Sequence, residues 1–324
     1  MSRQEPADQY ATFATTFSAI VENVERVIQG KLDVIQLALL CLLSEGHLLI
    51  EDVPGVGKTS LAKSLATSIK CTFGRVQFTP DLLPSDVMGV SVFNRASSDF
   101  EFRAGPIFAN IVLGDEINRA SPKTQSALLE AMAENQVTVD GTTYPLDAPF
   151  MVIATQNPIE HEGTYPLPES QLDRFLMRVS VGYPARDAEL EMLDAHGDHD
   201  AFDDITAVVR AADVNAMIAT ARTVHLAPSL KGYLIDLAEA TRNHPRLAMG
   251  MSPRASLNLQ RAARSRAIAA GRNYVVPDDI KALAEPVLAH RLVVTPEAQL
   301  AGLRSADVLD EVLRSVPVPS GRAR

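Results

Sequence analysis

Residues 48–69, LLIEDVPGVGKTSLAKSLATSI, decide the fold class of this chain. The first three residues form an apolar run typical of a short buried strand. Leu61, Leu65 and Ile69 then recur at helical spacing and predict a helix over 58–69. A loop with two glycines joins the run to the helix, and a further apolar run follows at 76–78. The order strand, helix, strand predicts an α/β fold with a parallel sheet.

The loop between this strand and helix has the residue types that bind phosphate. Gly55 and Gly57 allow backbone N–H groups to close around phosphate oxygens, and the next helix directs its positive N-terminal end at them. Lys58 can reach the β and γ phosphates of a nucleotide, and Thr59 can offer its hydroxyl to Mg²⁺. We therefore predict contacts to a nucleotide from one continuous run: Pro54, Gly55, Val56, Gly57, Lys58, Thr59 and Ser60.

Asp52 departs from the loop pattern G-x-x-x-x-G-K-[ST], because it stands where the pattern has its first glycine. That glycine serves the turn off the strand, and aspartate tolerates unusual backbone angles better than most residues. We interpret Asp52 as a conformational substitute for glycine. The loop is therefore still predicted to bind phosphate.

A second motif places two carboxylates at the end of another predicted strand. The apolar run 111–113 leads into Asp115 and Glu116, at the carboxyl edge where α/β sheets bind ligands. Asp115 is predicted to hold Mg²⁺, directly or through water, and Glu116 to polarise the water that attacks the γ phosphate. The run 150–154 leads to Asn157, whose amide can orient this water. A plain turn before Pro158 is the alternative for Asn157.

Composition disfavours several function classes. The chain has 324 residues, enough for two domains, and its 40 acidic and 30 basic residues give a formal net charge of −10. The average surface therefore repels nucleic acid and anionic membranes. Cys41 and Cys71 lack metal-ligand spacing and fit buried thiols in a reducing compartment. Because the sequence has no apolar segment long enough for a membrane span and no signal-like N-terminus, we expect no membrane insertion and a cytoplasmic location.

The sequence pattern predicts two domains. Helical spacing runs from Tyr10 to Leu43 with a break at Gly30, and it dominates again from 205 to the C-terminal region. The intervening segment near 194–204 is polar, acidic and aperiodic, and a solvated linker explains its His196 and His199 better than metal ligation. We predict an α/β core over 1–190, a linker over 191–204 and a small helical domain over 205–324.

In this order the motifs resemble those of the MoxR family of AAA+ ATPases. The segments that carry the resemblance are Val53–Thr59, Asp115–Ala120, Ala154–Pro158 and Glu169–Phe175. The resemblance implies a P-loop AAA+ core, with a parallel sheet flanked by helices, and a small all-helical lid. It also implies a homo-oligomeric ring, usually a hexamer, that holds ATP and Mg²⁺ between subunits.

The resemblance further implies roles for individual polar residues. Asn157 would be a sensor in the core, and Arg174 would be an arginine finger that reaches the neighbour's γ phosphate. Arg178, expected one helical turn later, stays an alternative finger. Arg254, which follows Pro253 near the start of a helix, would be the second sensor and point at the γ phosphate. No motif singles out the other arginines of that helix, to which we assign no role: Arg261, Arg264 and Arg266.

Two further segments resemble insertions of the helix-2-insert branch of this superfamily. One lies near 83–102, and the other lies near 136–146, where alternation around Asp140 and Gly141 predicts a β-hairpin. Val27 and Ile28, which precede the first core helix, are named only as candidate contacts to the adenine base.

The resemblance implies an ATP-driven, chaperone-like remodelling of a protein client, with a von Willebrand factor A domain protein as partner. A nucleic-acid motor, or a chelatase-type subunit of the same branch, is one alternative. Arg95 and Arg103 are the only basic residues in or beside the two predicted hairpins, which disfavours a pore for nucleic acid. A nucleotide-gated switch without turnover is another alternative. Glu116 and Arg174 disfavour a switch, since a switch needs only the residues that bind the phosphates.

Overall fold

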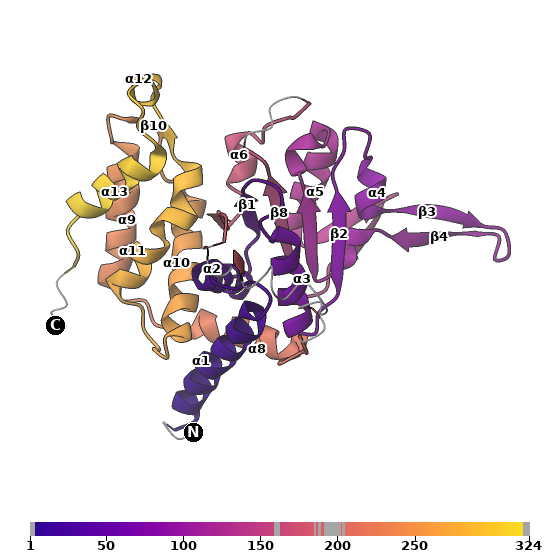
Figure 1. Cartoon of the computed structure of the whole chain (residues 1–324), viewed down its shortest axis with the longest axis horizontal. Coiled ribbons are helices and arrows are strands. Elements are labelled where there is room, and N and C mark those ends of the chain that lie inside the picture. The colour runs from indigo at the N-terminus through magenta and orange to yellow at the C-terminus, as the bar shows by residue number, and fades with distance from the viewer. Residues whose placement is uncertain are drawn as a thin grey trace.

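The computed structural model describes residues 4–158, 163–184, 186, 189, 190, 202 and 205–319 of the chain. Figure 1 shows an α/β part beside a group of helices from the C-terminal half. The helices of the first part are α1 (Gln4–Glu25), α2 (Leu32–Leu43), α3 (Lys58–Ser68), α4 (Pro84–Met88), α5 (Pro122–Glu134) and α6 (Glu169–Leu172). The predicted helix break at Gly30 lies between α1 and α2, where Gly30 has a φ of 70°.

The central sheet has five parallel strands in the order β2-β5-β8-β1-β9. Their bounds are β1 (Leu48–Glu51), β2 (Phe73–Gln77), β5 (Ile111–Asp115), β8 (Met151–Gln156) and β9 (Met177–Val179). Register pairs Glu51 with Gln156, and Gln77 with Asp115. Because every strand is parallel, the carboxyl ends of β1, β2, β5 and β8 share one edge. The predicted parallel sheet flanked by helices is confirmed.

Alternating side chains of the strands fill two separate cores. Leu48 and Ile50 point into the cluster formed with α1, α2, α3 and the C-terminal helices, whereas Leu49 points into the cluster formed with α4 and α5. All three side chains are fully buried. Burial on both faces explains why this strand appears in the sequence as a continuous apolar run.

The C-terminal part is a small, mainly helical domain. Its helices are α8 (Ala211–Thr223), α9 (Pro228–Arg242), α10 (Pro253–Ala269), α11 (Pro277–Leu288), α12 (Pro296–Leu300) and α13 (Ser305–Ser315). A short antiparallel pair that the sequence did not predict, β10 (Leu247–Met249) with β11 (Val293–Val294), ties two of its loops together. Apart from Phe202, the predicted linker at 191–204 lies outside the described residues, as do His196 and His199.

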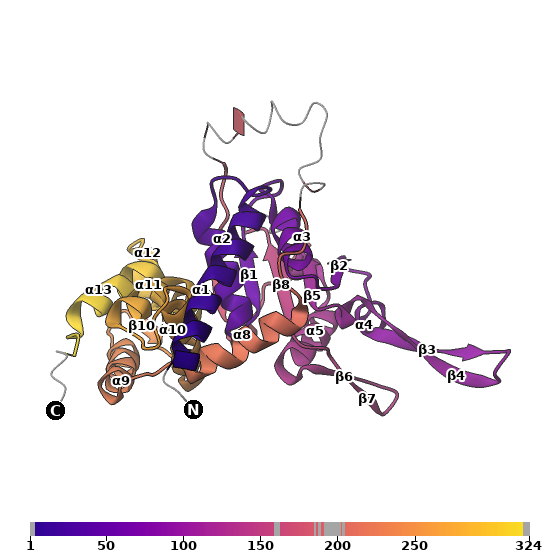
Figure 2. The ribbon, with the colours of Figure 1, turned by 90° about the horizontal axis from the view of Figure 1, so that it is seen from below.

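Two antiparallel hairpins project from the core. Strands β3 (Gly89–Asn94) and β4 (Asp99–Ala104) form the longer one, which extends far from the sheet in Figures 1 and 2. Strands β6 (Gln136–Val139) and β7 (Thr142–Pro145) form the shorter one, and its turn residues Asp140 and Gly141 have φ of 49° and 80°. Two consecutive positive φ values are typical of a type I′ turn. The shorter hairpin lies within the second segment where an insertion was predicted, and the longer one runs two residues beyond the first.

Candidate functional site

The glycine-containing loop lies between β1 and α3, at the carboxyl edge of the sheet. Gly55 and Gly57 have φ of 85° and 87°, a region that residues with a Cβ rarely adopt. The first hydrogen bond of α3 runs from Leu61 N to Gly57 O at 2.9 Å. The backbone N–H groups of 58–60 therefore lie outside the helical pattern and are available to an anion at the positive end of α3.

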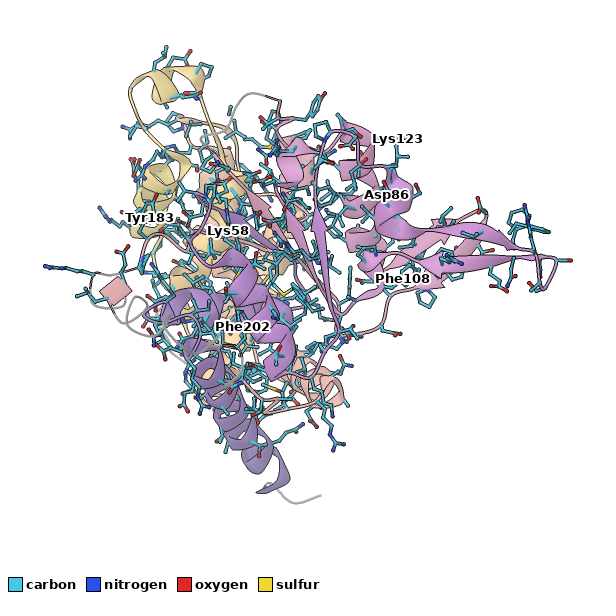
Figure 3. All side chains as sticks on the ribbon, turned by 45° about the vertical axis from the view of Figure 1, so that its right-hand side comes forward. Lys58, Asp86, Phe108, Lys123, Tyr183 and Phe202 are labelled. Atoms are coloured by element: carbon cyan, nitrogen blue, oxygen red, sulfur yellow. The ribbon has the colours of Figure 1, made fainter. Side chains whose placement is uncertain are left out.

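Lys58 occupies the first turn of α3, where Figure 3 labels it. The residue is 9% exposed, and its Nζ donates to the backbone carbonyl of Asp52 at 2.8 Å. Burial lowers the pKa of this ammonium, while Asp115, Asp52 and Glu116 act in the opposite direction. Its direct acceptor is a neutral carbonyl, and no carboxylate among the described residues forms an ion pair with this buried ammonium. That environment suits a phosphate.

Asp52 has a different role from the one predicted. Its backbone is not among the positive-φ residues, so the explanation by unusual backbone angles is wrong. Its carboxylate instead accepts hydrogen bonds from Val53 N at 2.9 Å, Ser180 Oγ at 2.9 Å and Gly182 N at 2.6 Å. Burial alone would raise the pKa of Asp52, but these hydrogen bonds outweigh it and lower the pKa. The carboxylate therefore ties the start of the loop to the segment after β9.

Asp115 and Glu116 lie at the same edge, at the end of β5. Thr155 Oγ1 donates to Asp115 Oδ1 at 2.7 Å, and Arg75 contacts Asp115 Oδ2 at 2.8 Å. Glu116 has a φ of 57°, a strained value for a residue with a Cβ. A hydroxyl at Thr59 and a carboxylate at Asp115 are the hard oxygen donors that Mg²⁺ takes from proteins, together with phosphate oxygens and water. The residues present therefore fit a magnesium ion bound with a nucleotide.

Sequence reasoning missed the side chains that hold the two carboxylates. Gln77, at the end of β2, donates from Nε2 to Glu116 Oε2 at 2.8 Å. Thr155 in β8 accepts from the backbone N of Glu116 at 2.9 Å while it donates to Asp115. Polar residues at the ends of apolar strands were the available signal, but their partners depend on which strands are neighbours.

Asn157 follows β8 directly, and β8 lies between β5 and β1 in the sheet. The carboxyl end of β8 therefore separates the acidic pair from the glycine loop. This brings Asn157 to the same edge as Glu116 and Lys58, as its predicted role requires.

Arg174 and Arg254 lie elsewhere, at the amino edge of the sheet. Both line one pocket with Glu45, Gly46 and His47, which directly precede β1. Arg174 donates to the carbonyl of Leu129, and Arg254 lies near the start of α10, 3.9 Å from Asp173. Within one chain, the structure therefore does not bring these arginines to the glycine loop.

The loop that carries Arg174 is fixed to the helical domain by an ion pair whose arginine is buried. Arg291 is 4% exposed and contacts Asp173 at 2.8 Å. Its guanidinium also donates to the backbone carbonyl of Leu176, and His290 Nε2 lies 3.2 Å from the carbonyl of Phe175. A movement of the helical domain would therefore be transmitted to the loop at 173–176.

Arg178 does not lie one helical turn after Arg174, and that expectation is wrong. It lies in β9, opposite Leu49 of β1, and contacts Glu51 at 2.9 Å. Gln156 donates to the same carboxylate. The sheet therefore uses Arg178 within its own chain.

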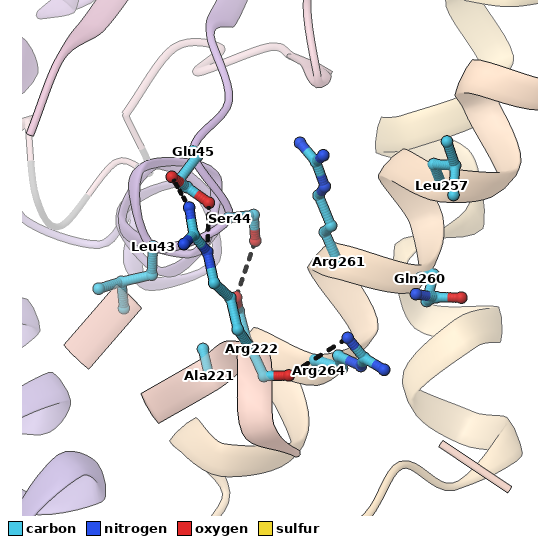
Figure 4. Close-up of a pocket in the computed structure, with 10 residues that line it drawn as sticks. Leu43, Ser44, Glu45, Ala221, Arg222, Leu257, Gln260, Arg261 and Arg264 are labelled. Atoms are coloured by element: carbon cyan, nitrogen blue, oxygen red, sulfur yellow. Dashed lines mark hydrogen bonds and ion pairs between the residues drawn. The ribbon is translucent and has the colours of Figure 1, made fainter. Parts of the chain in front are cut away.

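A second pocket, of about 370 Å³, lies between α8, α10 and the end of α2 and shares Glu45 with the amino-edge pocket. Figure 4 shows Arg261 and Arg264 of α10 beside Arg222, which pairs with Glu45. Arg261 lines both pockets. Arg261 is exposed and Arg264 is partly buried, and their contacts assign neither residue a chemical role.

Comparisons with known proteins agree with this geometry. The family model described as "ATPase family associated with various cellular activities (AAA)" matches residues 47–177, and the AAA lid domain matches residues 239–312. The chain is 40% identical to the chaperone MoxR1 of Mycobacterium tuberculosis, over 98% of this chain and 86% of that protein. The chain belongs to the MoxR family of AAA+ ATPases.

Two further similarities extend over nearly the whole length of this protein. It is 49% identical to the uncharacterized protein YeaC of Bacillus subtilis, over 94% of this chain and 95% of that protein. A solved structure of a candidate ATPase from Cytophaga hutchinsonii superimposes with a TM-score of 0.92 at 38% identity, covering 98% of this chain and 99% of that one. The fold is therefore an AAA ATPase domain with an AAA lid.

Two features that the described residues lack bear on other functions. Among these residues, no helix is both long and apolar enough to cross a membrane. In the same part of the chain, no group of three or more histidine, cysteine, aspartate or glutamate residues is arranged to hold a metal ion by itself. Cys41 and Cys71 are free thiols, and burial raises the pKa of Cys71 to about 11.

Proposed function

We propose that this MoxR-family chain binds ATP with Mg²⁺, hydrolyses it as a subunit of a hexameric ring, and uses the cycle to remodel protein clients. The observation that carries the proposal is the convergence of Lys58, Asp115 and Glu116 at one edge of the sheet. The carboxyl ends of β1 and β5 bring them together from two separate parts of the sequence. We propose ADP and phosphate as the products.

The proposed chemistry is positioning and electrostatic stabilisation. Gly55, Gly57 and the first turn of α3 grip the phosphates, and Lys58 exchanges the carbonyl of Asp52 for a phosphate oxygen. Mg²⁺, held through Thr59 and Asp115, would neutralise charge on the β and γ phosphates. Glu116 orients and deprotonates the attacking water, and Asn157 positions that water from the neighbouring strand end.

The proposal of a ring rests on the two edges of the sheet. Arg174 and Arg254 are cations at the amino edge, whereas the glycine loop lies at the carboxyl edge. For Arg174 or Arg254 to stabilise a γ phosphate, that phosphate must therefore be bound to a second copy. We propose that Arg174 is the finger and that Arg254 assists it at the neighbour's nucleotide. Arg178 is less suited to this role, because Glu51 and the sheet engage it.

A protein client fits the longer hairpin better than nucleic acid does. Phe93 and Phe100, near its tip, are 50% and 67% exposed. Their rings pack edge to face, with ring centroids 5.3 Å apart. Arg95 and Arg103 are offset by Asp99 and Glu101 in the same hairpin. Exposed aromatic side chains without excess positive charge favour apolar protein segments over a phosphate backbone. The von Willebrand factor A domain partner and the cytoplasmic location rest on the family resemblance and on the sequence.

Nucleotide binding and turnover test this proposal directly. Wild-type protein should bind ATP in a magnesium-dependent manner and release phosphate. Lys58→Ala should weaken ATP binding about 100-fold, because a charge-assisted contact to phosphate is lost. Lys63→Ala, in the same helix, is the matched control and should bind normally. Absence of magnesium-dependent ATP binding by the wild-type protein in any oligomeric state would refute the proposal.

Glu116→Gln separates hydrolysis from binding. The variant keeps the shape of the side chain but cannot accept a proton, so kcat should fall on the order of 10²- to 10⁴-fold while ATP affinity is retained. An equal loss of binding would contradict the role of Glu116 as a base. Because the Glu116→Gln variant should stay in the ATP-bound state, clients can be identified by pull-down with ATP and mass spectrometry of the bound proteins.

A further inference from the structure

Asp52 links the glycine loop to a segment that no nucleotide motif includes. Its carboxylate accepts from Ser180 Oγ and Gly182 N, both of which follow β9. Its backbone N donates to Gln156 O at 3.1 Å, and its backbone carbonyl accepts from Lys58 Nζ. One residue, 8% exposed, thus connects three strand ends and the lysine of the phosphate loop. Glycine at this position would provide none of the side-chain contacts.

The segment 180–183 is fastened a second time from the α1–α2 loop. Lys31 Nζ donates to the backbone carbonyl of Tyr183 at 2.7 Å. A Cβ placed on Gly182 would lie 3.8 Å from the same Nζ, and a Cβ placed on Gly57 would lie 3.7 Å from Cδ1 of Ile28. Three segments far apart in the sequence therefore meet beside the phosphate loop: residues 28–31, residues 52–57 and residues 180–183.

The side chains at this junction suit a flat, apolar ligand group. Ile28 is buried at 7% exposure and contributes an aliphatic surface next to Gly57. Tyr183 is 74% exposed although its backbone is held by Lys31, so its aromatic ring remains accessible. Aromatic rings stack on nucleobases with little dependence on base identity. The junction adjoins the phosphate loop, as the nucleoside end of a bound nucleotide must.

We propose that Asp52 is a positioning residue for the nucleoside end of the nucleotide: with Lys31 it holds segment 180–183 against the phosphate loop, so that Tyr183 and Ile28 contact the base. This proposal rests on the proposed nucleotide function. Removing the carboxylate would leave the N–H of Gly182 without its acceptor, which favours release of the segment. The phosphate loop keeps its glycines, its lysine and its helix, so its grip on phosphate is retained.

Comparison of two ligands tests the proposal in the full-length protein. Calorimetry gives the dissociation constants of MgATP and of magnesium tripolyphosphate, which lacks a nucleoside. Asp52→Gly restores the glycine of the loop pattern, yet it should weaken MgATP binding on the order of tenfold and change tripolyphosphate binding less than about threefold. Asp52→Asn, which keeps one acceptor oxygen, should fall between. Asp307→Asn, another carboxylate that accepts a backbone N–H, is the matched control.

Equal weakening for the two ligands, or unchanged MgATP binding, would overturn the proposal. If the wild-type protein binds neither ligand, the proposed function fails instead. Because Tyr183 is exposed, its substitution tests the proposal without disturbing the fold. Tyr183→Ala should weaken MgATP but not tripolyphosphate binding, on the order of tenfold, and Tyr183→Phe should restore it. Tyr274→Ala removes another exposed tyrosine, in the lid, and should leave both constants unchanged. If Tyr183→Phe did not restore MgATP binding, a stacking role for Tyr183 would be excluded.

Discussion

The two edges of the central sheet differ in what they can do within one chain. At the carboxyl edge, Lys58, Asp115 and Glu116 converge, and other side chains of the same chain orient the carboxylates. At the amino edge, Arg174 and Arg254 line a pocket without a phosphate-binding loop. In the proposed function, one edge supplies the phosphate contacts and the base, and the other supplies cations for the transferred charge. This difference is the reason we propose that each chain contributes two half-sites, which two copies complete.

This arrangement also couples the lid to catalysis in the proposed ring. The ion pair between buried Arg291 and Asp173 joins the lid to the loop of Arg174. A lid that responds to its own nucleotide would therefore move the arginine offered to the neighbour. Each prediction below changes one edge and measures the consequence for turnover, nucleotide binding or stability.

The largest expected effect comes from removing the arginine at the amino edge. Arg174→Ala should lower kcat on the order of 10³- to 10⁵-fold with ATP binding retained, because γ-phosphate charge loses its partner. Since the deficit falls on the neighbour's site, mixing the variant with wild-type protein should inhibit turnover more than dilution does. Arg261→Ala, in the same pocket, is the matched control. Unaffected turnover in mixed assemblies would mean that the two edges do not form one site.

The amino edge should also limit acid stability, through His47. Its Nε2 lies 2.9 Å from Met132 O, its Nδ1 accepts from Val152 N, and burial lowers its pKa from 6.5 to about 4. Below pH ~6.5 the imidazole of His47 takes up a proton in the unfolded chain, whereas in the folded chain it stays neutral down to about pH 4. Stability should therefore be intact above that pH and fall by about 3 kcal/mol as the pH drops toward 4.

Chemical denaturation of wild-type and His47→Gln protein across this pH range checks the loss. The variant should be less stable at neutral pH and have a shallower pH dependence, while His290 remains to titrate in both proteins. His225→Gln, an exposed residue, is the control. Identical slopes for wild type and His47→Gln would show that His47 is not responsible.

The smallest expected effect is at the carboxyl edge, at Gln77. Gln77→Leu removes the hydrogen bond to Glu116 and should lower kcat about tenfold, because the base loses one of its orienting contacts. ATP affinity should stay the same, which steady-state and equilibrium binding measurements can separate. Gln77→Asn tests whether the amide must reach Glu116: the shorter side chain should recover little of the lost kcat. A loss of ATP affinity equal to the loss of kcat would indicate damage to the phosphate loop rather than misorientation.

Much of the carboxyl edge could be predicted from the sequence, because its signals are local. The glycine loop from Gly55 to Lys58 needs only its neighbours along the chain, and the acidic pair directly follows an apolar strand. The fifth strand, β9, was not predicted, since three residues of Met177–Val179 provide too little alternation. For the same reason Arg178 was expected on a helix.

The sequence by itself determined the α/β class, the phosphate loop and the carboxylates, because short-range patterns of glycine, charge and apolar spacing set them. Only the tertiary structure decided that Asp52 contacts Ser180 and Gly182, that Gln77 and Thr155 hold the carboxylates, and that Arg174 lies at the opposite edge. Those contacts depend on the strand order β2-β5-β8-β1-β9, in which neighbours in space are distant in sequence. Strand order follows from packing two cores at once, and no local pattern encodes it.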